Sequence, residues 1–148
     1  MNILIVEDQK EKSDDICSFL ENFFSVFINI QVRSSLRSGL KSIISEKFDL
    51  VVLDMSMPNF DPSSEDPVGG TPESFAGKEF LAQMDLRERF VPVVVVTQYA
   101  TFSKGQVELE DLDAGLKNSY PNFYLGAVYY SSADEGWKNA MSEIIGGI

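Results

Sequence analysis

The segment that decides the fold of this chain is residues 48–58, with the sequence FDLVVLDMSMP. An apolar run ends there in the carboxylate of Asp54, and Pro58 marks a turn soon after it. Residues 2–8 (NILIVED) repeat the pattern, since an apolar run ends in Glu7 and Asp8. In an open parallel sheet, ligands collect beyond the carboxyl ends of the strands. If both runs are parallel strands, the three acids converge in a pocket that suits a hard divalent cation such as Mg2+.

Outward from this segment, strand and helix patterns alternate five times. Strands are predicted at residues 2–6, 28–32, 48–53, 91–97 and 123–130, each run followed by apolar residues at helical spacing. For the last helix, Ser132 with Glu135 three residues later predicts a capping box at the N-terminus. This alternation predicts an α/β fold in which helices cover both faces of a doubly wound, five-stranded parallel sheet.

The strand predicted at residues 91–97 (VPVVVVT) ends in the hydroxyl of Thr97 instead of an acid. The sequence is similar here to the receiver domain of two-component response regulators. The similarity consists of paired acids after the first strand, an Asp-x-x-Met-Pro motif that begins at Asp54 after the third, and Thr97 after the fourth. The resemblance covers nearly the whole chain and implies a flavodoxin-like (CheY-like) sheet of order 2-1-3-4-5. The switch point between strands 1 and 3 then places Asp8 beside Asp54.

The same resemblance implies a role for each residue of the pocket. Asp54 becomes the phospho-acceptor. Asp8 binds Mg2+ directly, Glu7 binds it directly or through water, and the backbone carbonyl of Ser56 completes the protein ligands. Thr97 contacts the phosphoryl group and couples its presence to the helix that follows.

One member of the family's site is missing from this sequence. The family has a Lys after strand 5, but residues 118–137 contain no Lys, and Tyr130 stands at the approximate position. A tyrosine donates one hydrogen bond and carries no charge at neutral pH. The pocket therefore lacks the positive charge that the family places after strand 5, and Lys78 and Lys104 are alternative cations that loops could bring in.

Composition limits the classes of function. The chain of 148 residues is predicted to be one domain, residues 1–148, and no apolar run approaches the length needed to cross a bilayer. A net charge of −11 disfavours nucleic acid and acidic membrane surfaces as partners. The single Cys17 excludes an internal disulfide and fits a reducing cytoplasm, and the absence of His excludes histidine chemistry within the chain.

Two connections are longer than the family norm. Residues 59–76 contain three prolines and two adjacent glycines among acids and serines, which is typical of an extended loop. The segment 98–122 is expanded as well. Loops of this length in compact domains tend to be functional or disordered.

Three functions are consistent with these patterns. The first is a Mg2+-dependent receiver that accepts phosphate on Asp54 from a histidine kinase or phosphotransfer protein and acts by binding an output protein. The second is a pseudo-receiver, an interaction module that phosphorylation does not regulate, which the missing Lys favours. The third is an Asp-nucleophile phosphatase of the haloacid dehalogenase type. That family needs a second Asp where this chain has Ser56, so we expect no enzyme activity beyond self-phosphorylation and dephosphorylation at Asp54.

Overall fold

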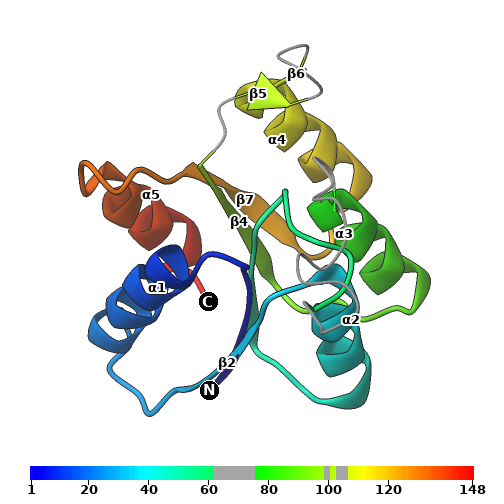
Figure 1. Cartoon of the computed structure of the whole chain (residues 1–148), viewed down its shortest axis with the longest axis horizontal. Coiled ribbons are helices and arrows are strands. Elements are labelled where there is room, and N and C mark those ends of the chain that lie inside the picture. Colours follow the sequence, from blue (N-terminus) through cyan, green and yellow to red (C-terminus); the bar gives the residue numbers. More distant parts are fainter. Residues whose placement is uncertain (62–75, 99–100, 103–106) are drawn as a thin grey trace.

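The computed structural model describes residues 1–61, 76–98, 101–102 and 107–148 (Figure 1). Most of the extended loop predicted at residues 59–76 lies outside the described residues. Among the described residues, no helix is long and apolar enough to span a membrane.

Five parallel strands form the central sheet. They are β1 (Asn2–Val6), β2 (Asn29–Arg33), β3 (Leu50–Leu53), β4 (Val93–Thr97) and β7 (Tyr124–Tyr129), in the spatial order β2-β1-β3-β4-β7. Because β7 is the fifth strand of this sheet, the predicted order 2-1-3-4-5 is confirmed. Two short strands that the sequence patterns did not predict, β5 (Thr101–Phe102) and β6 (Val107–Glu108), pair antiparallel within the expanded segment 98–122.

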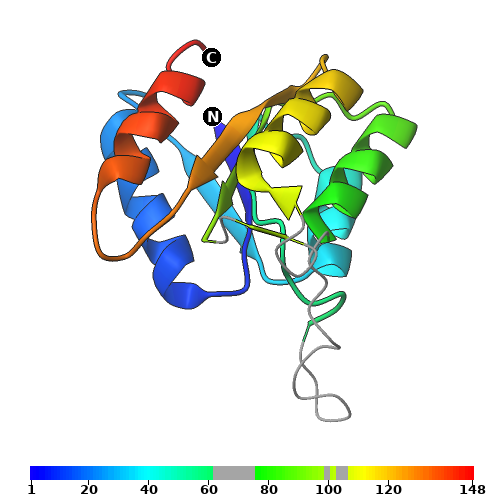
Figure 2. The ribbon, with the colours of Figure 1, turned by 90° about the horizontal axis from the view of Figure 1, so that it is seen from above.

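Helices cover both faces of the sheet (Figures 1 and 2). One face carries α1 (Lys10–Phe23) and α5 (Gly136–Ile145), and the other carries α2 (Leu36–Ser45), α3 (Ala76–Leu86) and α4 (Leu109–Ser119). The strand interiors alternate between two apolar cores. In β1, for example, Ile3 and Ile5 pack under α1 and α5, while Leu4 and Val6 pack under the other three helices. Burial on both faces explains why the strand sequences are continuously apolar.

The capping box predicted for the last helix is wrong. Helix α5 begins at Gly136, and its N-cap residue Glu135 makes no capping hydrogen bond through its side chain. The carboxylate of Asp134 instead accepts a hydrogen bond from the backbone N–H of Gly136. The short acid next to the helix start thus satisfies a free N–H of the first turn, and no capping box forms between Ser132 and Glu135. A capping box does begin α2, where Ser35 and Ser38 bond each other's backbone N–H groups.

The first turn of α3 lies directly against the backbone that follows β3. The N–H of Gly77 donates to the carbonyl of Met55, and a Cβ atom at Gly77 would lie 2.5 Å from the carbonyl oxygen of Asp54 and 2.9 Å from the Cα of Met55. Neither contact is with a flexible side chain, so a larger residue must displace backbone. Glycine at this position therefore lets α3 approach the end of β3.

We predict that Gly77→Ala lowers the free energy of unfolding by about 1–3 kcal/mol, the usual cost of overpacking. The matched control is Gly115→Ala, because Gly115 is an exposed glycine of α4 at which an added Cβ would meet no atom within 4 Å. That substitution should raise stability by up to about 1 kcal/mol through helix propensity. Urea denaturation of the two variants measures both effects, and equal stabilisation by both would show that the contact at Gly77 is easily relieved.

Candidate functional site

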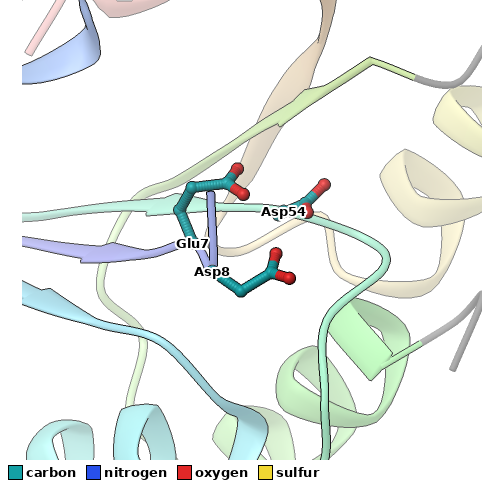
Figure 3. Close-up of side chains that lie close together, drawn as sticks. All are labelled: Glu7, Asp8 and Asp54. Atoms are coloured by element: carbon teal, nitrogen blue, oxygen red, sulfur yellow. The ribbon is translucent and has the colours of Figure 1, made fainter. Parts of the chain in front are cut away.

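Three carboxylates meet at the carboxyl edge of the sheet (Figure 3). Glu7 and Asp8 follow β1, and Asp54 follows the neighbouring strand β3. The register pairs Val6 with Leu53, so the residues that follow these two positions leave the sheet side by side. One oxygen from each of the three side chains can be chosen so that all lie within 4.8 Å of one another.

Glu7 is held in a buried position. The residue is 3% exposed, its N–H donates to the carbonyl of Arg33, and its Oε2 accepts a hydrogen bond from the N–H of Gln9 at 3.1 Å. Burial is the largest cause of a raised pKa at Glu7, and the nearby charge of Asp54 adds to it. Interaction with Lys12 opposes both effects but does not cancel them. In the absence of a metal ion, the folded protein therefore favours a protonated Glu7.

Asp54 is fixed by the backbone on either side of it. Its N–H donates to the carbonyl of Val6, and its Oδ1 accepts a hydrogen bond from the N–H of Met55 at 2.8 Å. Only 5% of the residue is exposed. Burial raises the pKa of Asp54, and the charge of Asp8 raises it further, while Lys12 and the backbone of Ser56 lower it. Two ionised acids so close together in a buried place are costly without a cation.

A cation that the sequence analysis missed lies in this site. Lys12 of α1 is 1% exposed, and its Nζ lies 2.5 Å from Oε1 of Glu7 and 3.3 Å from Oδ1 of Asp54. From the sequence, Lys78 and Lys104 were named as the alternative cations, and Lys12 was not considered. The physical reason for its burial is helical spacing: Lys12 precedes the buried Ile16 and Leu20 by four and eight residues, so it shares their inward face of α1. That spacing was the available signal.

Two other lysines were named from the sequence as alternative cations. Lys78 is exposed on α3, and Lys104 lies outside the described residues.

Tyr130 follows directly after β7, level with the end of β4. Its N–H donates to the carbonyl of Thr97, and its hydroxyl donates to Oδ2 of Asp15 on α1 at 2.5 Å. Its ring lies 5.3 Å from that of Trp137, centroid to centroid. Burial and the hydrogen bond to Asp15 raise the pKa of Tyr130, which therefore remains a protonated donor. The residue predicted at the position of the missing Lys thus ties α1 to the sheet.

The other predicted site residues lie at the same edge. Thr97 is the last residue of β4, next to β3 in the sheet, and it is completely buried. Ser56 is half-buried in the turn that follows Asp54. The structure thus gathers the ends of β1, β3, β4 and β7 around the acids, as the topology predicts.

The donor set fits a hard divalent cation. Oxygen atoms of carboxylates are the ligands that Mg2+ and similar ions prefer, and Asp8 is exposed and so open to solvent. Oε1 of Glu7 is buried and lies 2.5 Å from Nζ of Lys12, so a metal ion at this oxygen would compete with the lysine. Within the described part of the chain, Nζ of Lys12 contacts Glu7 and Asp54 and has no further hydrogen-bond partner.

Comparison with solved structures places this fold among CheY-like receiver domains. The response regulator receiver domain (CheY-like) from Methanospirillum hungatei matches with a TM-score of 0.61 and 20% identity. The match covers 99% of this chain and 91% of that chain. The Mn2+-bound response regulator Rcp1 gives a TM-score of 0.65 over 97% of this chain and 90% of its own, at 19% identity. The response regulator TrrA from Thermotoga maritima, in complex with Mg2+-BeF, has a TM-score of 0.60 and 19% identity. The match covers 97% of this chain and 98% of the TrrA chain.

Two curated proteins are similar along nearly their whole length. The uncharacterized protein y4jR of Sinorhizobium fredii is 34% identical over 145 residues, covering 95% of this chain and 94% of the relative. The Detocs response regulatory protein DtcB of Enterobacter cloacae is 31% identical over 146 residues, covering 95% of each. No family model matches the chain. With fold, site position and full-length similarity in agreement, the chain belongs to the receiver domains of two-component response regulators.

Proposed function

We propose that this protein is a signalling receiver that accepts a phosphoryl group on Asp54 and acts by binding a partner protein. The observation that carries the proposal is the convergence of Glu7, Asp8 and Asp54 at the carboxyl edge of the sheet, with oxygens within 4.8 Å. We expect the whole chain to act as one domain, to receive its phosphoryl group from a histidine kinase or phosphotransfer protein, and to work in the cytoplasm.

In this reaction an oxygen of Asp54 attacks the phosphorus atom of the donor. The bond from phosphorus to the donor breaks, and its electron pair leaves with the donor group, while Asp54 becomes an acyl phosphate. The protein's contribution is to position the carboxylate, which the N–H of Met55 fixes through Oδ1. Positioning and charge stabilisation are the main sources of catalysis in phosphoryl transfer.

Glu7, Asp8, Asp54 and the backbone carbonyl of Ser56 are the proposed ligands of a divalent ion, and we propose Mg2+. Bound there, Mg2+ would neutralise negative charge on the transferred phosphoryl group. The support is the chemistry of the donor set together with the described neighbours, since Rcp1 is Mn2+-bound and TrrA is in complex with Mg2+-BeF. Thr97, buried at the neighbouring strand end, is the proposed phosphoryl contact.

A pseudo-receiver is the second candidate function, and a specific observation favours it. Lys12 is already paired with Glu7 and Asp54, so the buried charges are partly satisfied with no ligand at all. In that case the acids and Lys12 serve as a structural ion-pair network, and the fold acts as an interaction module without phosphorylation.

Incubation with acetyl phosphate and Mg2+ separates the two candidates. We predict that intact-mass spectrometry will show one added phosphoryl group on the unmodified sequence and none on Asp54→Asn. The control is Asp111→Asn, which removes an exposed acid of α4 far along the chain from the site and should leave labelling unchanged. Labelling of Asp54→Asn to the same degree would place the acceptor elsewhere, and no labelling of the parent protein would favour the pseudo-receiver.

A further inference from the structure

Lys12 is one of the large, fully buried side chains among the described residues, and the others of that group are apolar. Its ammonium lies between two acids, 2.5 Å from Glu7 and 3.3 Å from Asp54. Removing such a charge from water is expensive, and ion pairing in a protein interior often fails to recover the cost. A buried lysine directed at the proposed phospho-acceptor therefore calls for an explanation beyond stability.

The surroundings of Lys12 hold it in this place. Its Nζ lies 5.9 Å from the centroid of the Tyr130 ring, and the Tyr130 hydroxyl is bonded to Asp15, one turn further along α1. Trp137 packs against the same tyrosine. The residue after β7 thus lies against Lys12 and fixes the helix that carries it.

The hydrogen-bond donors of the Lys12 ammonium group leave room for a further ligand. An ammonium group has three N–H donors. Among the described residues, Nζ of Lys12 closely contacts two acceptor atoms, Oε1 of Glu7 and Oδ1 of Asp54, and has no other hydrogen-bond partner, so not all of its donors are used. A group that arrives on Asp54 with several acceptor oxygens would come within reach of these donors, because Nζ already lies 3.3 Å from Oδ1.

We propose that Lys12 is the cation that contacts the phosphoryl group on Asp54, and that α1 supplies the positive charge that residues 118–137 lack. The inference rests on the proposed phosphorylation of Asp54. With acetyl phosphate as donor, an oxygen of Asp54 forms the new bond to phosphorus, the bond between phosphorus and the acetyl oxygen breaks, and acetate leaves with the electron pair. Lys12 supplies charge and hydrogen bonds, and it neither gains nor loses a proton in this reaction.

The test is binding of beryllofluoride, a phosphoryl mimic, in saturating Mg2+ to folded variants, with folding checked by thermal melting. Lys12→Met should bind the mimic roughly 10–100-fold more weakly, the usual value of one charge-assisted hydrogen bond. Lys12→Arg should retain much of the affinity, because the charge is kept. The matched control is Lys10→Met, which removes an exposed lysine of the same helix and should bind like the parent protein.

A second measurement separates this role from a structural one. Without beryllofluoride, Lys12 competes with Mg2+ for Glu7 and Asp54, so Lys12→Met should bind Mg2+ more tightly while it binds the mimic more weakly. A residue that merely supports the fold would weaken both ligands together. If Lys12→Met does not fold, the same comparison is made between Glu7→Gln and the double variant Glu7→Gln/Lys12→Met, in which one buried acid has been removed.

A third measurement asks whether a lysine at position 130 can replace Lys12. In the parent protein, Tyr130→Lys would bring a second cation close to Lys12 and should not improve binding of the mimic. In the Lys12→Met background the same change should restore affinity. If the parent protein binds beryllofluoride and Lys12→Met binds it equally well, the inference about Lys12 is overturned while the proposed function stands. If the parent protein does not bind the mimic, the proposed function fails and the inference fails with it.

Discussion

In millimolar Mg2+ the melting temperature of this protein is expected to rise, and the rise should grow as the pH increases from about 4.5 to about 8. Ligands that bind only the folded state stabilise it by mass action. The pH dependence has its origin in Glu7, whose pKa is raised by burial and then by the charge of Asp54. Mg2+ binds the ionised acid, so it must displace a proton at low pH but not at high pH.

The sign of the metal-free pH dependence follows from the same shift. Between about pH 4.5 and about pH 8, Glu7 keeps its proton in the folded state but has lost it in the unfolded state. The free energy of unfolding therefore falls as the pH rises through this range. Glu7 alone can contribute at most about 1.4 kcal/mol per pH unit. The raised pKa of Asp54 acts in the same direction.

Thermal melts across this pH range, with and without Mg2+, measure both effects. Glu7→Gln should flatten the metal-free slope, and Asp8→Asn or Asp54→Asn should remove the response to Mg2+. The matched control is Glu21→Gln, an exposed acid of α1, which should behave like the parent protein. Equal responses to Mg2+ in the parent protein, Asp8→Asn and Asp54→Asn would show that these acids do not form the cation site.

Without metal at alkaline pH, Lys12→Met is expected to lower the free energy of unfolding by about 3 kcal/mol, because removing one member of a buried ion pair leaves the other charges unpaired. For a domain of this size that corresponds to a fall of roughly 6–12 °C in melting temperature. The loss should shrink at lower pH, where Glu7 takes up a proton and no longer needs a cation.

A double-variant cycle tests whether the loss comes from the acids. In the Asp54→Asn background, Lys12→Met should cost less than in the parent protein, since one of its two partners is already neutral. Lys10→Met provides the surface reference, and its effect should stay within about 0.5 kcal/mol. If Lys12→Met costs the same in both backgrounds, the destabilisation comes from packing of the lysine stem rather than from its charge.

The sequence by itself determined the sheet and the position of the acids. Continuous apolar runs separated by helical periodicity can be satisfied only by strands buried on both faces, and this predicted the parallel sheet and its covering helices. Parallel strands end at the same edge, and the order 2-1-3-4-5 that the family resemblance implied places β1 beside β3, so the carboxylates that follow these two strands were expected to meet there. The sheet follows from local patterns along the chain, and the meeting of the acids follows from those patterns together with the strand order that the resemblance implied.

Only the tertiary structure decided what else enters the site. Lys12 is separated by 42 positions from Asp54, and its contact with that residue depends on how α1 packs on the sheet. The hydroxyl of Tyr130 bonds Asp15 across 115 positions for the same reason. A search for the missing lysine along one predicted strand could not find a charge supplied by another element. The strand patterns determine where the site forms. The packing of α1 on the sheet determines that Lys12 supplies its positive charge, because this contact joins residues that are far apart in the sequence.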